Sequence, residues 1–371
     1  MNKKKIICVI GAGISGLSTA SLLMQLGYQV HIISKDDPRS AALNPEFSSL
    51  FPAASIIPHA VNSDELNEVF SISKNYFETL YSQRFPGVTK TKHYELFSYH
   101  KEVPDYANVM EQFRIFNEFR GEFYPEHPDH HVKSGWRFET YFADWPLYFP
   151  ALIQKVLNKV SGFEIKELKT EDLPALPFDV IVNCTEIGSI DLFGDTSGRI
   201  IHRGHLINIP GAATIMDPKG DPVSYNYYPG KQVYRSESGC EQDVYCYSRN
   251  DGLVLGGSRQ KGYINENREW QGEENVDPVT NVQNLELPTQ IIEIHKEILK
   301  FSFDYELPPV SEMHSKLGYR FTRSTENGLR IQAEEVGDKL VIHNYGHGGA
   351  GVTLSWGCAQ KVSGLLQQLT W

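Results

Sequence analysis

The chain has 371 residues, of which 40% are hydrophobic, and its formal net charge is −11. A chain of this length and hydrophobic content can bury a large core, so disorder is excluded and about two domains are expected. The acidic balance, with no basic run after Lys3-Lys4-Lys5, argues against nucleic acid as a partner because phosphate binding depends on clustered cations.

Several short patterns indicate the compartment and the absence of a metal. The apolar run before Gly11 is too short for a secretion signal or a membrane span, so we expect neither. The five cysteines are scattered without Cys-x-x-Cys spacing, which favours a reducing compartment and argues against structural zinc. His127, His130 and His131 lie in a Pro- and Asp-rich stretch that reads as a solvated loop more naturally than as a metal site. The end at Trp371 is no peroxisomal signal, so we expect a cytoplasmic location.

The first elements along the chain form a predicted strand–turn–helix–strand unit. A buried strand over residues 5–10 leads into Gly11-Ala12-Gly13-Ile14-Ser15-Gly16, then a helix, and then a second strand over residues 29–33. The first glycine permits a tight turn, the second lets the backbone touch a pyrophosphate, and the third lets helix and strand pack closely. The segment therefore predicts dinucleotide binding on a Rossmann fold.

One element of that fingerprint is missing. The second strand usually ends in Asp or Glu, which binds a ribose hydroxyl, but here it ends in Ser34, followed by Lys35 and Asp36. We expect Ser34, Asp36 or a backbone group to reach the ribose instead. The departure weakens the case for NAD in particular.

The middle of the chain leaves this first unit and returns to it. Residues 44–59 have no helical period and are expected to form an extended loop. The apolar run over residues 178–185 predicts a strand buried on both faces, in the same parallel sheet as residues 6–10. Hydrophobic periods also predict helices over residues 66–81 and 146–160 and strands over residues 94–99 and 136–141.

The last third of the chain predicts a second kind of sheet and a second glycine-rich loop. Residues 200–260 alternate in polarity and contain turn signals such as Asn250-Asp251-Gly252, so they predict an antiparallel sheet, followed by a helix near residues 288–301. A strand from Val341 then runs into Gly346-His347-Gly348-Gly349-Ala350-Gly351 and a helix. Such a loop approaches a ligand closely, and the helix start offers unpaired N–H groups to an electron-rich partner. We expect two interleaved domains with the ligand between them.

Ordered segments along nearly the whole chain carry a family resemblance. They are the Gly11–Gly16 fingerprint, Gly135-Trp136 with Asp144-Trp145-Pro146-Leu147-Tyr148, the strand over residues 178–185, Arg203-Gly204-His205, Leu255-Gly256-Gly257-Ser258-Arg259-Gln260, Gly318-Tyr319-Arg320 and the C-terminal glycine-rich block. Together they resemble the D-amino-acid oxidase family of FAD enzymes.

The resemblance implies a fold, a cofactor and a reaction. The implied α/β fold has a glutathione-reductase-like FAD-binding Rossmann domain (residues 1–58, 146–200 and 316–371) interleaved with an antiparallel-sheet substrate-binding domain (residues 59–145 and 201–315). The implied cofactor is FAD. The implied reaction oxidises a D-amino acid to an imine, which hydrolyses to a 2-oxo acid and ammonia, while oxygen becomes hydrogen peroxide. The expected partners are a small D-amino acid and oxygen, with no nucleic acid and no membrane, and a homo-oligomer is left open.

The resemblance also implies which residues bind substrate and cofactor. Arg320 matches the arginine that clamps the substrate α-carboxylate, for which a planar fork of donors is suited. Tyr245 matches the second carboxylate contact, although Ser248 replaces the family's proline and leaves Tyr225, Tyr227 and Tyr228 as alternatives. The backbone at Gly348 and Gly349 is expected to accept the substrate amine. The residues expected at FAD are Gly11, Ala12, Gly13, Ile14, Ser15, Gly16, Ser34, Lys35, Ser48, Ala53, Ala54, Ser55, Thr185, Gly188, Gly348, Gly349, Gly351, Val352 and Thr353.

Three further positions bear on the choice of substrate. His59, Tyr247 and Arg259 resemble the D-aspartate oxidase branch, and a second substrate carboxylate in a partly buried pocket needs a compensating cation. These residues therefore predict a preference for acidic D-amino acids. The alternative is a neutral D-substrate, with Arg259 paired to an acidic neighbour and His59 merely packing.

Some residues depart from the family pattern. Glu186 replaces the usual glycine after Asn183-Cys184-Thr185, near the expected FAD site, and would weaken cofactor affinity. With Ser248 and Ala350 it motivates a third interpretation, a flavin-binding protein without turnover. An FAD dehydrogenase with an acceptor other than oxygen is a further alternative.

Overall fold

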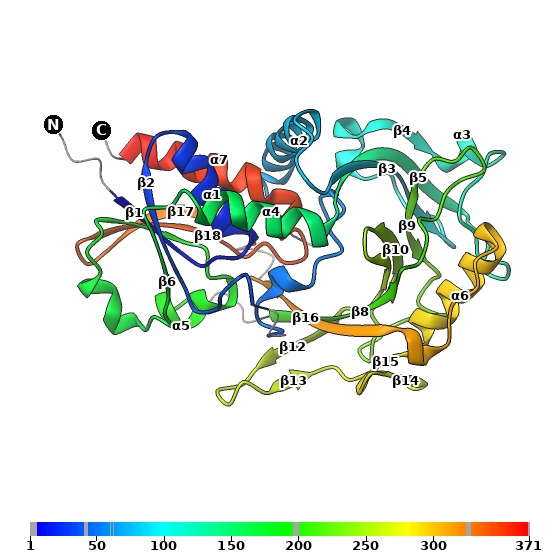
Figure 1. Cartoon of the computed structure of the whole chain (residues 1–371). Coiled ribbons are helices and arrows are strands. Elements are labelled where there is room, and N and C mark those ends of the chain that lie inside the picture. Colours follow the sequence, from blue (N-terminus) through cyan, green and yellow to red (C-terminus); the bar gives the residue numbers. More distant parts are fainter. Residues whose placement is uncertain are drawn as a thin grey trace. The chain divides into compact units, whose positions relative to one another are not determined.

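The computed structural model describes residues 6–40, 44–59, 61, 63–195, 200–323 and 328–369. The chain divides into two compact units, each assembled from separate stretches of sequence (Figure 1). The first unit comprises residues 1–86, 147–200 and 320–371, and the second comprises residues 87–146 and 201–319. Each unit is built around a large sheet of its own.

The first unit contains a six-stranded sheet in the order β17-β18-β7-β1-β2-β6. Its strands run parallel except for β17, which lies antiparallel to β18 at one edge. The central strands β1 and β7 are mainly apolar and buried, the pattern of a parallel sheet covered on both faces. Pairing of β7 with β1 confirms the predicted place of residues 178–185. The strands are β1 (Ile6–Ile10), β2 (Gln29–Ser34), β6 (Gly162–Ile165), β7 (Val180–Asn183), β17 (Arg330–Val336) and β18 (Lys339–Tyr345).

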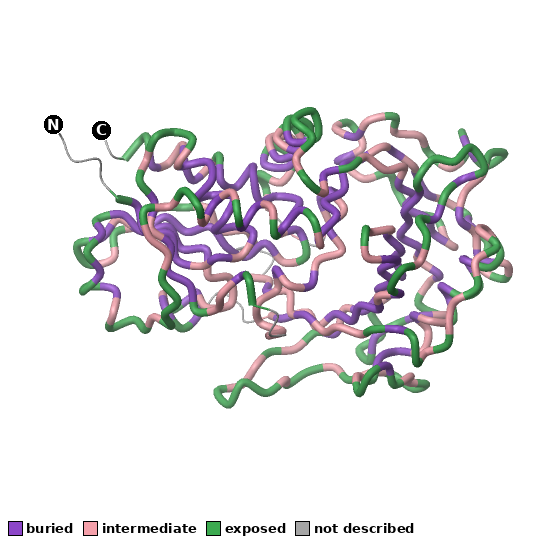
Figure 2. The backbone as a smooth tube through the Cα atoms, viewed as in Figure 1, coloured by how far each residue is buried: buried purple, intermediate pink, exposed green. Residues whose placement is uncertain are grey.

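In the first unit, helix α7 contacts both α1 and α2 (Figure 1). The buried residues of α2 recur along one stripe, from Val69 to Leu80, while its other side is exposed (Figure 2). A Cβ on Gly357 of α7 would lie 2.0 Å from the Val69 carbonyl oxygen, so the two helices need a glycine at their crossing. The helices are α1 (Ile14–Gln25), α2 (Leu66–Ser82), α4 (Trp145–Leu157), α5 (Ser189–Phe193) and α7 (Gly351–Leu369).

The contact between α2 and α7 moves one of the predicted boundaries. The sequence places residues 59–86 in the substrate-binding domain, but they belong to the first unit because α2 lies along α7. Residues 316–319 go the other way and belong to the second unit, because β16 pairs with β8 of the larger sheet.

The second unit contains a ten-stranded sheet in the order β13-β12-β8-β11-β10-β9-β3-β5-β4, with β16 paired to β8. The ladders from β8 to β11 are antiparallel, which confirms the sheet predicted over residues 200–260, while β3 and β9 run parallel. The strands are β3 (Val88–Phe97), β4 (Glu111–Ile115), β5 (Ser134–Ala143), β8 (Ile200–Pro210), β9 (Val223–Tyr228), β10 (Val244–Arg249), β11 (Gly252–Gly256), β12 (Gln260–Ile264), β13 (Trp270–Gly272) and β16 (His314–Thr322).

Helix α6 covers one face of this sheet, where Tyr225, Tyr227 and Cys246 share a hydrophobic core with its isoleucines. Because side chains alternate along a strand, Tyr245 and Tyr247 project from the opposite face. The remaining elements are α3 (Phe116–Phe119), α6 (Thr289–Phe303) and a hairpin of β14 (Val279–Val282) and β15 (Leu285–Pro288).

The stretch that contains His127, His130 and His131 is less exposed than the solvated loop expected from the sequence. His127 is buried and its ring stacks on Tyr227, with 6.3 Å between the ring centroids, so the stretch is not simply solvated. Within the described ranges, no group of three or more His, Cys, Asp or Glu side chains is placed to hold a metal ion. All five cysteines are free, and no helix among the described residues is long and apolar enough to span a membrane.

Candidate cofactor and substrate sites

The Gly11–Gly16 turn links β1 to α1, and its glycines are required by close packing. Gly11 has a φ of +107°, and a Cβ there would lie 2.4 Å from the Cys184 carbonyl oxygen of the chain leaving β7. A Cβ on Gly16 would lie 1.9 Å from the Gly11 carbonyl oxygen. Side chains at these two positions would therefore push apart β1, α1 and the end of β7.

The second glycine of the turn lies against a serine that sequence reasoning missed. A Cβ on Gly13 would lie 2.9 Å from Ser49 Oγ, and the same oxygen accepts the Ile14 N–H at 2.9 Å. Ser48, which is expected at FAD, opens the short helical turn Ser48–Leu50 that also holds Ser49, and its contact with the cofactor stays a prediction. The sequence shows two adjacent serines near the turn, but backbone geometry decides which of the two hydroxyls faces it.

The end of β2 shows what replaces the missing acidic residue. Ser34 Oγ accepts the Ala12 N–H at 3.2 Å and donates to the Asp36 carbonyl at 2.8 Å, so this buried hydroxyl supports the glycine-rich turn. Lys35 forms an exposed ion pair with Glu167 at 2.8 Å. A ribose contact by Ser34 or Asp36, and a cofactor contact by Lys35, stay predictions.

The chain leaving β7 forms a compact polar turn. Thr185 Oγ1 donates to Asn183 Oδ1 at 2.7 Å, and the Gly188 N–H donates to the Thr185 carbonyl at 2.9 Å. A Cβ on Gly188 would lie 3.1 Å from the Thr185 Cβ, so the two predicted cofactor residues are in contact distance of each other. Between them lies Glu186, whose φ of +49° is typical of glycine rather than of a residue with a Cβ.

The C-terminal glycine-rich loop joins β18 to α7, as predicted. Gly346 and Gly348 have φ of +84° and +56°, and the Gly348 N–H donates to the Phe321 carbonyl at 3.0 Å. This bond brings the loop next to Arg320, the neighbour of Phe321 in β16. The first hydrogen bond of α7 runs from the Leu354 N–H to the Ala350 carbonyl. The preceding N–H groups, at the predicted positions 351–353, therefore form the donor-rich start of the helix.

The loop over residues 53–57 is tied to that helix start. Thr353 Oγ1 lies 3.2 Å from both the Ser55 and Ile57 carbonyl oxygens. Ala54 has a φ of +70°, and the hydroxyl of Ser55 is buried without a hydrogen-bond partner among the described residues. An unpaired buried hydroxyl, glycines that admit no Cβ and an N–H-rich helix start together fit a large polar cofactor such as FAD.

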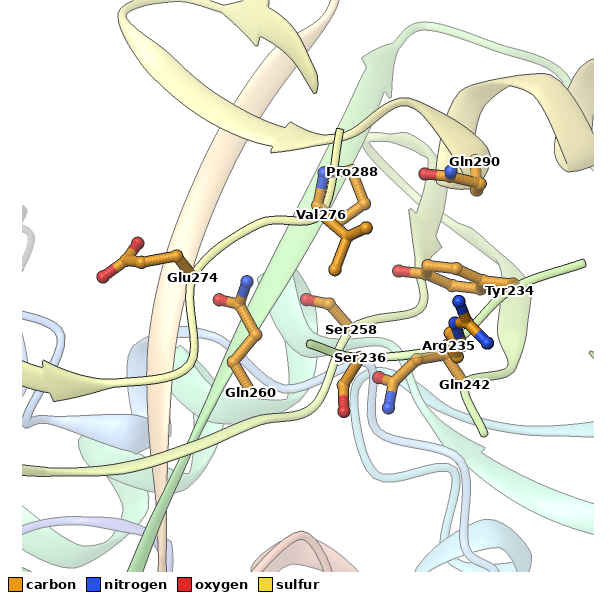
Figure 3. A pocket seen from close by; sticks show the side chains of 10 residues that line it. All are labelled: Tyr234, Arg235, Ser236, Gln242, Ser258, Gln260, Glu274, Val276, Pro288 and Gln290. Atoms are coloured by element: carbon orange, nitrogen blue, oxygen red, sulfur yellow. The ribbon is translucent and has the colours of Figure 1, made fainter. Parts of the chain in front are cut away.

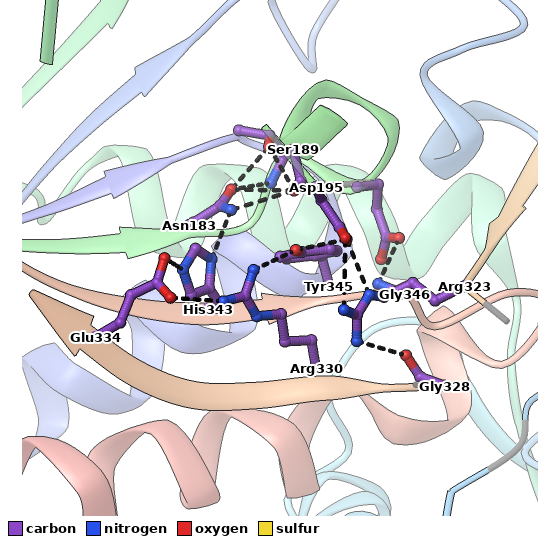
Figure 4. Close-up of polar contacts among 12 residues, drawn as sticks. Asn183, Ser189, Asp195, Arg323, Gly328, Arg330, Glu334, His343, Tyr345 and Gly346 are labelled. Carbon is purple, nitrogen blue, oxygen red and sulfur yellow. Dashed lines mark hydrogen bonds and ion pairs between the residues drawn. The ribbon is translucent and has the colours of Figure 1, made fainter. Parts of the chain in front are cut away.

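Behind the loop lies a buried polar network that crosses β7, β18 and β17 (Figure 4). Tyr345 Oη donates to Asp195 Oδ2 at 2.7 Å, and Arg323 Nε pairs with the same oxygen at 2.9 Å. His343 lies between Asn183 and Glu334, at 3.0 and 2.8 Å. Burial lowers the pKa of His343, and its two polar neighbours hold it within the sheet, so it supports the fold at the end of β18.

His347, in the loop between β18 and α7, forms an ion pair with Glu186, which follows β7. His347 Nδ1 contacts Glu186 Oε1, and the Gly346 N–H donates to Glu186 Oε2 at 3.0 Å. Burial opposes a charge on His347, but the Glu186 carboxylate and the Cys358 side chain together outweigh it and raise the pKa of His347 to about 10.

In the second unit, Tyr245 lies across from Gly256 in the β10–β11 hairpin. A Cβ on Gly256 would lie 2.3 Å from the Tyr245 hydroxyl oxygen, so the phenol ring covers the glycine. The alternatives Tyr225 and Tyr227 point into the core under α6, and their hydroxyls contact His295 Nδ1 and the His130 carbonyl. Tyr245 therefore remains a better candidate than these two for a substrate contact.

Tyr247 and Arg259 are joined by a chain of polar contacts. Tyr247 Oη donates to Asn226 Oδ1 at 2.7 Å, and Asn226 Nδ2 donates to Asp243 Oδ2 at 3.2 Å. Asp243 in turn forms an ion pair with both terminal nitrogens of Arg259. Asp243 was not named from the sequence, yet it connects two of the three residues predicted to select the substrate.

A small polar pocket adjoins the backbone of Arg259 (Figure 3). Gln242 Oε1 accepts the Arg259 N–H at 2.6 Å, and Ser258 Oγ accepts the His205 N–H at 2.8 Å. Tyr234 Oη and Gln290 Oε1 also line the pocket and are buried without a partner among the described residues. The space is suited to about one water molecule bridging such groups.

The predicted residues thus assemble within each unit. In the first unit, the two glycine-rich segments, Thr185, Gly188 and the 53–55 loop meet at the ends of parallel strands, and Arg320 lies beside the second glycine-rich segment. His59 follows the same loop, where its N–H donates to the Ile57 carbonyl at 3.0 Å. In the second unit, Tyr245 and Tyr247 share the sheet face opposite α6, and Arg259 is connected to Tyr247 through Asp243 and Asn226.

Comparison with known proteins identifies the family. A sequence model of the FAD-dependent oxidoreductases matches residues 7–365. The chain belongs to this family. It is 26% identical to D-aspartate oxidase of Homo sapiens and 27% identical to D-amino-acid oxidase of Dictyostelium discoideum, covering 98% of this chain in each case and 94% and 91% of those proteins.

Solved structures have the same fold. L-α-glycerophosphate oxidase of Mycoplasma pneumoniae, determined with FAD bound, superimposes with a TM-score of 0.66 at 14% identity, covering 98% of this chain and 95% of that chain. Glycine oxidase of Geobacillus kaustophilus gives a TM-score of 0.62 at 12% identity, covering 98% and 94%. These comparisons confirm the predicted fold class, the D-amino-acid oxidase resemblance and FAD as the cofactor.

Proposed function

We propose that this FAD-dependent oxidoreductase deaminates D-amino acids to 2-oxo acids and ammonia and forms hydrogen peroxide from oxygen. The observation that carries the proposal is the hydrogen bond from the Gly348 N–H to the Phe321 carbonyl. It brings Arg320, a bidentate binder for a carboxylate, next to a glycine-rich backbone able to accept an amine. An α-amino acid presents these two groups on adjacent atoms.

The chain's own residues would orient the substrate rather than exchange protons with it. Arg320 would fix the α-carboxylate, with Tyr245 as its second contact, and the Gly349 backbone would accept the amine, so that Cα is held in one orientation. Bound FAD supplies the acceptor for the hydride from Cα. The N–H groups of residues 351–353 would stabilise negative charge at the edge of the ring system.

For the side chain of the substrate, we propose acidic D-amino acids as the preferred class. The support is the side chain of Arg259, which is 30% exposed, its polar connection to Tyr247, and 26% identity to a protein named D-aspartate oxidase.

A second candidate is a neutral D-substrate, and the Arg259–Asp243 ion pair favours it. The two charges cancel, so this part of the site carries no net positive charge for a second carboxylate. In this case Arg259 would act as a polar donor held in place by Asp243.

The decisive experiment is reduction of the protein-bound flavin without oxygen. Holoprotein is mixed anaerobically with D-aspartate, D-glutamate, D-alanine and L-aspartate, and the flavin absorbance is followed. Bleaching by D- but not L-substrates supports the proposal, and no bleaching by any of the D-amino acids would contradict it and favour a flavoprotein without turnover. Faster bleaching by D-alanine than by D-aspartate would contradict the proposed preference for acidic substrates.

Admission of air distinguishes an oxidase from a dehydrogenase. Rapid reoxidation with stoichiometric peroxide supports the oxidase. Reoxidation by a quinone or dye but not by air would indicate the dehydrogenase alternative.

A further inference from the structure

Glu186 occupies a strained position that links two segments of the candidate cofactor site. Its φ of +49° lies in the left-handed region, which residues with a Cβ adopt at a cost in free energy. Such a conformation persists when surrounding contacts compensate for it. At Glu186 these contacts are the Gly346 N–H and the ring of His347, both in the loop between β18 and α7.

The hydrogen bonds around His347 indicate that its ring carries a positive charge. Nδ1 contacts the Glu186 carboxylate, and Nε2 lies 3.2 Å from Asn344 Oδ1, whose amide nitrogen donates to Thr19 Oγ1 at 3.0 Å. Both ring nitrogens thus face oxygen acceptors, which requires a proton on each of them. Nδ1 also lies 3.4 Å from Ser15 Oγ, in the first glycine-rich turn.

We propose that Glu186 is a positioning residue that holds the Gly346–Gly349 loop in one conformation for FAD, through the Gly346 N–H and the charged ring of His347. The inference rests on the family's cofactor and not on the choice of substrate.

The physical reason lies in the composition of the loop. Glycine loses more conformational freedom than any other residue when it is ordered, and this loop contains three glycines within four positions. The Gly348 N–H is bound by the Phe321 carbonyl, and Glu186 provides a second anchor two residues earlier. A loop ordered before FAD arrives binds it with a smaller entropic cost.

Glu186 would weaken FAD binding instead if its charge acted on the cofactor directly. A carboxylate near a pyrophosphate repels it and weakens binding. Here the positive charge of His347 lies against that carboxylate, so the pair is neutral as a whole. The two possibilities therefore predict opposite changes in FAD binding when the charge is removed.

The test compares release of FAD from the purified full-length holoprotein and from two variants. Glu186→Gln keeps the shape and a hydrogen-bond acceptor but removes the charge, and Glu186→Gly removes the whole side chain. Release is measured by the recovery of free-flavin fluorescence on dilution, with no substrate present. We expect release at least about tenfold faster for Glu186→Gly and an intermediate increase for Glu186→Gln.

The matched control is Glu68→Gln, which removes an exposed carboxylate of α2 that pairs with Lys361 of α7. Its FAD release is expected to match that of the parent protein. FAD release from either Glu186 variant that is as slow as from the parent protein, or slower, would overturn the proposal. Slower release is the result expected if Glu186 repels the cofactor. Because no substrate takes part, the result is independent of which amino acid the enzyme oxidises.

A spectroscopic measurement on the parent protein tests the geometry without a variant. ¹⁵N NMR of the imidazole groups should show His347 doubly protonated at pH 8, and neutral at the same pH in Glu186→Gln. A neutral His347 in the parent protein at pH 8 would overturn the proposed role of the pair.

Discussion

The fully buried carboxylate of Asp243 forms an ion pair with the guanidinium of Arg259, whose side chain is 30% exposed. Asp243 also accepts a hydrogen bond from Asn226, which in turn accepts one from Tyr247. The residue that would attract a second substrate carboxylate is therefore already paired with a carboxylate of the protein.

Asp243→Asn should shift the substrate preference toward acidic D-amino acids. The amide keeps its volume and an oxygen for Asn226, while Arg259 loses the negative charge that balances it. We expect kcat/KM for D-aspartate relative to D-alanine to rise by about tenfold, equivalent to about 1.4 kcal/mol. Asp251→Asn, which alters an Arg–Asp pair at the turn of the same hairpin, is the control and should leave the ratio unchanged. An unchanged ratio for Asp243→Asn as well would mean that Arg259 does not meet the substrate side chain.

Arg259→Met should reduce activity on D-aspartate far more than on D-alanine. The same change leaves Asp243 buried without its cation, which costs about 3–5 kcal/mol of folding stability for such pairs. The double variant Asp243→Asn/Arg259→Met should recover most of that stability but not the activity on D-aspartate. Thermal unfolding and steady-state kinetics separate the two effects, and equal losses on both substrates would assign Arg259 a structural role.

Arg320→Lys should lower the activity on every D-substrate to a similar extent, because the α-carboxylate is common to all of them. A lysine cannot reproduce the bidentate fork, and loss of a charged hydrogen bond costs about 1.5–3 kcal/mol. We expect kcat/KM to fall by about 10- to 150-fold for D-alanine and D-aspartate alike, with the flavin content unchanged. A loss confined to one substrate would contradict the carboxylate role.

Gly16→Ala should destabilise the first unit and reduce its FAD content. The added Cβ would lie 1.9 Å from the Gly11 carbonyl oxygen, and such overpacking typically costs about 1–3 kcal/mol. Gly364→Ala in α7 is the matched control, because a Cβ there meets nothing within 4 Å. That change should stabilise the helix by up to about 1 kcal/mol. Thermal unfolding followed by circular dichroism measures both, and equal midpoints would show that the turn tolerates a larger residue.

The Glu186–His347 pair should make stability depend on pH in a defined direction. Because the pKa of His347 is raised in the folded protein to about 10, above its usual 6.5, the stabilisation is complete below pH 6.5 and is lost as the pH rises through 10. The groups facing the ring are Glu186, Ser15, Asn344 and Cys358. Denaturant unfolding should therefore show the parent protein losing stability relative to Glu186→Gln between pH 7 and about 10. A constant difference over that range would contradict the charged pair.

Much of the fold follows from local sequence patterns. The Gly11–Gly16 turn, the apolar strand over residues 178–185 and the glycine-rich loop before α7 each have a periodicity or a backbone requirement confined to a few neighbouring residues. The same holds for the helix over residues 66–81, although its assignment to the first unit required its contact with α7. Long-range packing, unlike periodicity, decides to which core a helix belongs.

The contacts of the candidate site residues were harder to predict from the sequence. The β10–β11 hairpin pairs Tyr245 with Gly256, and the same register continued for two residues past this pair brings Asp243 level with Ser258, next to Arg259. The sequence contained this information, but it becomes a contact only when the turn type and register are known. No such counting connects Glu186 to His347, which lie 161 positions apart.

The sequence by itself determined the family, the cofactor and the glycine positions, because these depend on backbone conformations that few residues can adopt. The tertiary structure decided which charges meet. It paired Arg259 with Asp243, Glu186 with His347, and the Ile14 N–H with Ser49. Electrostatic interactions fall off with distance and depend on burial, so the charge of a site is set by neighbours that only the folded chain brings together.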